Sequence, residues 1–329
     1  MNEFVLCDGP ALHGLRTVVI ENSLLRIVVL PEAGAKIWQI TYKPLHAELL
    51  WNSPTVAPAG QALNACYDDV WSGGWDELFP TDEPFTFMGK LLPDHGELWT
   101  GEWQAKPIDG GVHLAFTTPV SHFLVEKTLL LRVESSTLEI GYRLTNKGDE
   151  RFPFMFKLHP AFAVSPEHRI DFPPMRVTME PEFRGTLSEA PEVFRWPYAP
   201  MGDRMLDLRQ VPDVSSRALR FFYGDELEAG WCGVTNRSNR LAAALRFDAA
   251  VFPSCWLFAS HGGWQNVNAA VLEPATGYPF KMQPMIDAGR ARWLGAGESL
   301  ETAVLFCVQE GLTSIGGVEE DGRILAGEE

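Results

Sequence analysis

The run LLRIVVLPEAGAKIWQITYK, residues 24–43, decides the fold class. Two segments rich in Val, Ile, Leu and Thr flank Pro31-Glu32-Ala33-Gly34, and Pro and Gly supply turn geometry between such β-prone segments. We therefore expect a hairpin of two neighbouring strands, over residues 24–30 and 35–43.

A strict alternation of apolar and polar side chains supports further strands. Over residues 137–145 the apolar side chains fall on one face, which is typical of a half-buried strand. After a turn at residues 146–149, the run 151–159 alternates in the same way and places its phenylalanines on one face. His159 then shares the opposite face with Lys157.

More strand-like runs follow along the chain, among them FLVEKTLLLRV, LAAALRF, SCWLFAS, NAAVLEP and TAVLFCV. Long helical periodicity is hard to find, and no repeat, low-complexity linker or break in composition divides the sequence. The sequence predicts an all-β fold, a large antiparallel β-sandwich that forms a single domain over residues 1–329.

Composition excludes several classes of function. The 329 residues are 46% hydrophobic and 21% charged, as in an ordinary globular protein. A net charge of −16 without any Lys/Arg-rich run argues against nucleic acid and anionic membranes as partners. No segment reaches the roughly 18 apolar residues of a membrane helix. The five scattered cysteines suit buried thiols, so we expect a soluble, cytoplasmic protein, of open oligomeric state.

Motifs for cofactor chemistry are absent from the sequence. It contains no Walker A sequence, G-x-S-x-G elbow, HExxH or CxxC, and GAGES at residues 295–299 lacks the third glycine of a dinucleotide fingerprint. The eight histidines do not cluster at metal-ligand spacings. We therefore expect no metal and no organic cofactor, and acid/base chemistry by ordinary side chains.

Four segments place titratable residues in apolar or glycine-rich surroundings: GGWDELFP (73–80), PDHGE (93–97), KLHPAF (157–162) and LEPATGYP (272–279). In this order they resemble the aldose 1-epimerase (galactose mutarotase-like) superfamily, and the likeness extends almost from end to end. The resemblance implies a β-supersandwich without a cofactor that interconverts the α and β anomers of a small-molecule sugar.

Carried over to this sequence, the resemblance implies that His95 binds substrate, that His159 is the general acid and that Glu273 is the general base. The residue types suit the chemistry. A carboxylate removes the proton of the anomeric hydroxyl while an imidazolium protonates the ring oxygen, and the hemiacetal opens. A histidine pKa of about 6.5 suits both directions of a reversible reaction.

Other candidates surround this pair. Where many family members have an arginine after the HG motif, this sequence has Trp99, so Trp75, Trp99 and Trp264 are candidate platforms for a sugar ring. Lys157 could pair with an anionic substituent on the sugar, although a lysine on the solvent face of a strand is the simpler interpretation. Asp76 could line the cleft or cap its own backbone in a bulged turn.

Three functions stay open from the residues. The first is a mutarotase for a hexose or a substituted, anionic hexose. The second is a non-catalytic carbohydrate-binding sandwich, although such a module needs neither an acid nor a base. The third is a glycoside hydrolase or lyase that uses Glu273 with Asp76 or Glu77 as a carboxylate pair.

His261, upstream of Glu273, is a weaker candidate for the site.

Overall fold

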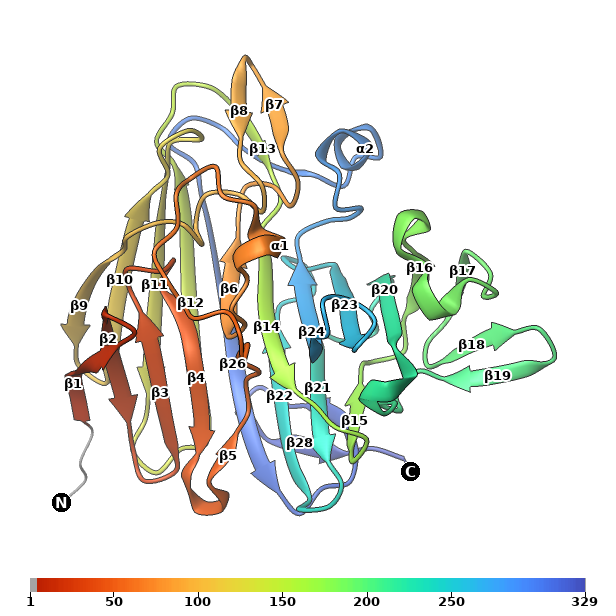
Figure 1. Ribbon diagram of the computed structural model, residues 1–329. Helices are drawn as coiled ribbons and strands as arrows, with labels where there is room; N and C mark the ends of the chain where they lie inside the picture. Colours follow the sequence, from red (N-terminus) through yellow and green to blue (C-terminus); the bar gives the residue numbers. More distant parts are fainter. Residues whose placement is uncertain (1–4, 329) are drawn as a thin grey trace. The chain divides into compact units, whose positions relative to one another are not determined.

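The computed structural model describes residues 5–328 (Figure 1). Strands make up 50% of the structure and helices 7%, and the paired strands are antiparallel. The longest helix, α2, has six residues. The all-β class predicted from the alternating sequence pattern is confirmed.

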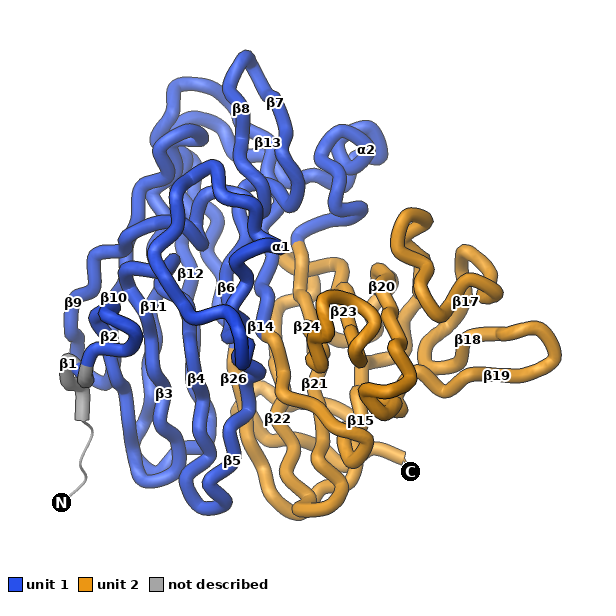
Figure 2. Tube along the Cα trace, viewed as in Figure 1, with its two compact units in different colours: residues 1–160, 276–304 blue, residues 161–275, 305–329 orange. Residues whose placement is uncertain are grey.

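The chain divides into two compact units (Figure 2). Unit 1 is formed by Met1–Pro160 and Thr276–Val304, and unit 2 by Ala161–Ala275 and Leu305–Glu329. Two strands, β14 and β26, each continue from one unit into the other, so the division does not follow a linker. The single domain over residues 1–329 stays a prediction.

Unit 1 contains strands of two large sheets, two further two-stranded sheets and a few short helices. One sheet has the order β1-β2-β3-β4-β6-β14, with β5 beside β4, and the other has the order β12-β11-β10-β9. Their bounds are β1 (Val5–Leu12), β2 (Leu15–Glu21), β3 (Leu25–Leu30), β4 (Lys36–Tyr42), β5 (Ala47–Glu48), β6 (Trp75–Leu78), β9 (Gln104–Ile108), β10 (Gly111–Thr117), β11 (Phe123–Leu131), β12 (Thr137–Asn146) and β14 (Lys157–Ala163). The short elements are η1 (Lys43–Leu45), α1 (Tyr67–Val70), β7 (Phe85–Phe87), β8 (Lys90–Leu92), β13 (Phe152–Phe154), α2 (Met282–Asp287) and β25 (Arg292–Leu294).

Two predicted strand pairs test the sequence analysis. The hairpin of residues 24–43 is confirmed as β3 and β4, whose register begins at Leu30 opposite Lys36. The alternation of residues 137–145 is confirmed as β12. The prediction of one strand over residues 151–159 is wrong, because β13 ends at Phe154 and β14 begins at Lys157. Between them the amide of Phe156 donates to the hydroxyl of Thr276, 2.9 Å away, instead of continuing a ladder.

Unit 2 also contains strands of two large sheets and two further two-stranded sheets. One has the order β24-β23-β20-β16-β17 and the other the order β15-β21-β22. Their bounds are β15 (His168–Asp171), β16 (Arg176–Met179), β17 (Val193–Arg195), β20 (Ala218–Asp225), β21 (Trp231–Asn236), β22 (Leu241–Phe247), β23 (Ser254–His261) and β24 (Asn268–Ala275). The remaining elements include β18 (Tyr198–Met201), β19 (Arg204–Asp207), β26 (Ser299–Glu310), β27 (Ile315–Val318), β28 (Ile324–Ala326), η2 (Pro181–Phe183), η3 (Gly185–Leu187) and η4 (Val214–Ser216).

A buried carboxylate joins the two sheets of unit 1. Glu77 on β6 accepts hydrogen bonds from Lys127 on β11, at 2.8 Å, and from the hydroxyl of Tyr142 on β12, at 2.6 Å. The ammonium group of Lys127 also donates to the carbonyl of Ala35. Because all three side chains are almost completely buried, these contacts satisfy polar groups that water cannot reach.

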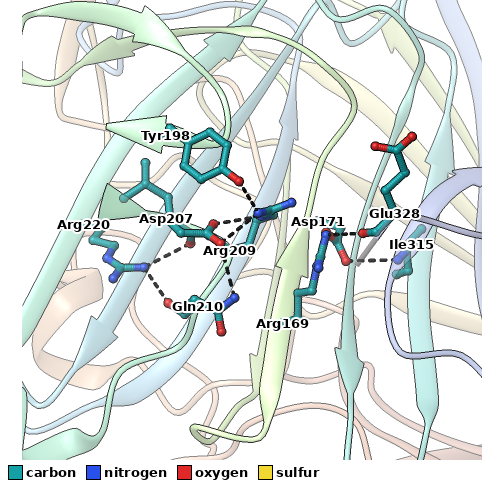
Figure 3. Close-up of polar contacts among 10 residues, drawn as sticks. Arg169, Asp171, Tyr198, Asp207, Arg209, Gln210, Arg220, Ile315 and Glu328 are labelled. Carbon is teal, nitrogen blue, oxygen red and sulfur yellow. Dashed lines mark hydrogen bonds and ion pairs between the residues drawn. The ribbon is translucent and has the colours of Figure 1, made fainter. Parts of the chain in front are cut away.

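A second buried ion pair ties β15 of unit 2 to the C-terminal segment (Figure 3). Arg169 donates through Nε to Oδ1 of Asp171, at 2.8 Å, and through a terminal nitrogen to the carbonyl of Glu328, at 3.0 Å. The amide of Ile315 donates to the other Asp171 oxygen, also at 3.0 Å. Asp171 thus neutralises a buried arginine and holds β27.

We expect Asp171→Ala to lower the free energy of unfolding by about 3–5 kcal/mol, because it leaves the Arg169 guanidinium buried without a counter-ion. Urea unfolding, monitored by tryptophan fluorescence, measures the change. Glu320→Ala is the matched control, because that carboxylate is 93% exposed in its pair with Arg246 and should contribute about 0–1 kcal/mol. Equal losses in the two variants would contradict this account of Asp171.

Candidate active site

The pairing of β14 with β6 builds one face of the candidate site in unit 1. His159 lies opposite Asp76, and Lys157 lies opposite Leu78, two residues along the ladder. Since residues opposite one another or two apart share a face of a sheet, His159, Lys157 and Asp76 are on the same face. The shared face of His159 and Lys157 agrees with the sequence-based expectation. Glu77 points to the opposite face, towards Lys127.

Asp76 is held by a buried ion pair. Its Oδ2 accepts from the ammonium group of Lys36 at 2.5 Å and from the hydroxyl of Tyr67 at 2.8 Å. Lys36 also donates to the carbonyl of Gly73 at 2.7 Å. The backbone cap considered for Asp76 is therefore not what the structure shows. Gly73 has a φ of +86°, and a Cβ there would lie 2.3 Å from the carbonyl oxygen of Trp51.

Tyr67 stands at the centre of the site. Its hydroxyl lies 3.2 Å from Nδ1 of His159, and its ring stacks on His95 with centroids 4.2 Å apart. The edge of Trp99 meets the same ring at 5.0 Å. Sequence reasoning missed Tyr67, which belongs to a four-residue helix, α1, without periodicity or motif. The only sequence signal at this position is a tyrosine followed by two acidic residues, Asp68 and Asp69.

His95 occupies a tight turn against the β6 strand. Its φ is +54°, and the following Gly96 could not carry a side chain, because a Cβ would lie 2.1 Å from the carbonyl oxygen of Phe79. Nδ1 of His95 lies 2.9 Å from a carboxylate oxygen of Asp94, and Nε2 lies 3.9 Å from Asp82. Burial disfavours the charged ring, but the two carboxylates outweigh it and raise the pKa of His95.

His159 has the opposite electrostatic environment. Burial, followed by the charges of Lys157, His95 and Lys36, holds the pKa of its imidazole well below the usual range. The expectation of an ordinary pKa near 6.5 is therefore wrong for this residue. At neutral pH the ring is neutral, with Nδ1 facing the hydroxyl of Tyr67.

Lys157 is buried, not solvated. Its side chain is 3% exposed, and its ammonium group lies 2.7 Å from a carboxylate oxygen of Asp82. The interpretation as a surface lysine is therefore wrong. Pairing of Lys157 with an anionic sugar stays a prediction, in which the substrate would share the ammonium group with Asp82.

The three candidate tryptophans have different surroundings. Trp75 is completely buried, and Trp99 is 5% exposed, with its indole nitrogen donating to the carbonyl of Asp94 at 3.1 Å. Trp75 therefore offers no ring face to a sugar, and Trp99 supports the loop that holds His95. Trp264 is half-buried in unit 2, where its ring meets the edge of Phe258 at 5.4 Å.

Glu273 belongs to unit 2, on β24, and is 1% exposed. It lies opposite Trp256 on β23, which lies opposite Tyr223 on β20. The hydroxyl of Tyr223 donates to a carboxylate oxygen of Glu180 at 2.5 Å. Glu273 therefore shares its sheet face with two aromatic rings, one of which is hydrogen-bonded to a second carboxylate. His261 lies five residues from Trp256 on the same strand and so faces the other side. It does not join Glu273.

Within residues 5–328, no three His, Cys, Asp or Glu side chains are grouped so that they could hold a metal ion. In the same part of the chain, the helices are too short and too polar to cross a membrane.

Comparisons with known proteins agree on the fold. No protein-family model matches the sequence. The uncharacterized protein YphB of Escherichia coli (strain K12) is 35% identical over 104 residues, which are 31% of this chain and 33% of that protein. The match therefore spans about a third of the length of this curated relative.

Solved structures match over most of the chain. A proposed aldose 1-epimerase from Klebsiella pneumoniae gives a TM-score of 0.70 at 14% identity, covering 93% of this chain and 82% of that one. A galactose mutarotase-like protein from Lactobacillus casei gives 0.65 at 17% identity, covering 89% and 100%. A galactose mutarotase related enzyme from Lactobacillus acidophilus gives 0.64 at 15% identity, covering 89% and 97%.

The chain therefore has the large β-sandwich fold of the aldose 1-epimerase (galactose mutarotase-like) superfamily. The resemblance inferred from the ordered sequence motifs is confirmed at the level of the fold. At these identities the structural likeness establishes the fold alone.

The opposite pKa shifts of the two histidines predict opposite effects on stability. The pKa of His159 is lower in the folded protein than in the unfolded chain. Its contribution to the free energy of unfolding is therefore complete above about pH 6.5 and is lost as the pH falls. For His95 the folded pKa is raised, so its contribution is complete at low pH and is lost as the pH rises.

Urea unfolding at pH 5, 6 and 7 tests both signs. We expect His159→Gln to lose less stability than wild type between pH 7 and pH 5, and His95→Gln to lose more. Parallel changes in the two variants would show that the assigned environments are wrong.

Proposed function

We propose that this chain is an aldose 1-epimerase that interconverts the α and β anomers of a hexose or a substituted hexose. The observation that carries the proposal is the group of His159, Tyr67, Asp76 and Lys36, a buried neutral imidazole oriented by a hydrogen-bonded network. The names of the structural neighbours, which include a galactose mutarotase related enzyme, support a sugar as the substrate.

The reaction needs two proton transfers. One group removes the proton from the anomeric hydroxyl, the electron pair forms the C1 carbonyl, and the bond from C1 to the ring oxygen breaks. A second group protonates that oxygen. Rotation about the bond between C1 and C2, followed by ring closure on the other face of the carbonyl, gives the second anomer. We assign the two transfers to His159 and Glu273, with His95 as a hydrogen-bond donor to the sugar.

NMR saturation exchange at the anomeric protons of neutral, phosphorylated and sulfonated hexoses tests this proposal. Enzyme-dependent exchange is expected for at least one sugar, and Glu273→Gln and His159→Gln should each slow it about 10²–10⁴-fold. Glu301→Gln, at a carboxylate that is 68% exposed, should change nothing.

Two outcomes would contradict the mutarotase. One is exchange no faster than the buffer blank for every sugar, although some bind, which would favour a carbohydrate-binding module. The other is release of free sugar from an aryl glycoside, which would establish a hydrolase.

The substrate's charge can be tested at Lys157. If an anionic substituent pairs with its ammonium group, Lys157→Met should reduce the preference for anionic over neutral hexoses by about tenfold, which corresponds to about 1.4 kcal/mol. The ratio of kcat/KM values for a hexose phosphate and its parent hexose measures this preference. The exposed Lys106→Met is the control. An unchanged ratio in Lys157→Met would exclude the pairing.

A further inference from the structure

The hydroxyl of Tyr67 lies between two groups that compete for its single proton. Oδ2 of Asp76 is 2.8 Å away, and Nδ1 of His159 is 3.2 Å away. A phenol can donate one hydrogen bond and can also accept one. The direction of the first bond therefore decides what the imidazole nitrogen must do.

The ion pair of Asp76 decides that direction. The same Oδ2 accepts from the Lys36 ammonium group at 2.5 Å, so the carboxylate is charged and can only accept. A hydrogen bond to a charged acceptor is roughly twice as strong as one between neutral groups. The proton of Tyr67 therefore points to Asp76, and the phenol oxygen presents a lone pair to His159.

We infer that Tyr67 is a positioning residue, which fixes the proton of His159 on Nδ1 and leaves Nε2 as a basic lone pair in the resting protein. The inference rests on the proposed function for its meaning in catalysis, and it reverses the role that the family resemblance assigned to His159. Nε2 takes the proton of the anomeric hydroxyl, and a carboxylic acid, for which Glu273 is the candidate, protonates the ring oxygen. Ring closure returns both protons.

Contacts of its backbone and of its ring hold Tyr67 in place. Its backbone amide donates to Asp94 at 2.8 Å, and its ring is stacked on His95 and met by the edge of Trp99. Because the ring cannot swing away without losing these contacts, the hydroxyl stays between Asp76 and His159. The lowered pKa of His159 agrees with a neutral ring, in which one nitrogen lacks a proton.

Long-range ¹H–¹⁵N correlation spectra of the histidine rings test the tautomer directly, without a substrate. The His159 signals are assigned by their loss in His159→Gln. At pH 7.5 we expect Nδ1 of His159 in the protonated range and Nε2 in the unprotonated range. In Tyr67→Phe, which keeps the ring contacts, the proton should shift towards Nε2.

Tyr142→Phe is the matched control, because it removes another buried hydroxyl that donates to a carboxylate, that of Glu77, and should leave the His159 signals unchanged. A proton on Nε2 in wild type, or identical His159 signals in wild type and Tyr67→Phe, would overturn the inference.

The kinetic consequence is a split between kcat and KM. Tyr67→Phe should lower the anomeric exchange rate at saturating sugar at least about tenfold with little change in KM, because the hydroxyl orients the base and does not bind the sugar. The two proposals fail separately. If His159 carries its proton on Nδ1 but no sugar undergoes anomeric exchange, only the proposed function fails. If a sugar exchanges but His159 in the resting protein carries its proton on Nε2, only this inference fails.

Discussion

The ion pair between Lys36 and Asp76 is the interaction on which the candidate site depends. Both side chains are almost completely buried, so their charges compensate one another where water cannot. Lys36 is the first residue of β4 and Asp76 lies on β6, so the pair also ties the predicted hairpin to the strand beside β14. The oriented carboxylate then fixes Tyr67, and Tyr67 contacts both histidines.

One aromatic ring therefore touches two histidines whose pKa values are shifted in opposite directions. Two carboxylates raise the pKa of His95, whereas burial, followed by the positive charges of Lys157, His95 and Lys36, lowers the pKa of His159. A pair of titratable groups with separated pKa values is typical of sites for proton transfer. In such an arrangement His95 suits donation of hydrogen bonds to a sugar, whereas neutral His159 suits acceptance of a proton.

Sequence reasoning succeeded where the information is local. The alternation over residues 137–145 and the turn at residues 31–34 depend on neighbours in the chain. The strand β12 and the hairpin of β3 and β4 were therefore predicted correctly. It failed where distant residues decide. The interruption at Phe156 depends on Thr276, which lies 120 residues away. The role of Tyr67 depends on contacts with β6, β14 and the loop of residues 94–99. The burial of Lys157 depends on its ion pair with Asp82.

Trp99 stands where many members of the superfamily that the sequence resembles have an arginine, and it adds no charge to the candidate site. Trp99 donates to the backbone of Asp94 and packs against Tyr67, so it supports the loop and offers no charge. The positive charge of unit 1's site comes instead from Lys36 and Lys157, each on a strand and each held by an aspartate. A lysine is a compact charge with three donors but without the planar fork of arginine. Lys36 therefore donates to the carboxylate of Asp76 and to the carbonyl of Gly73, but it does not present a pair of parallel donors to one planar group.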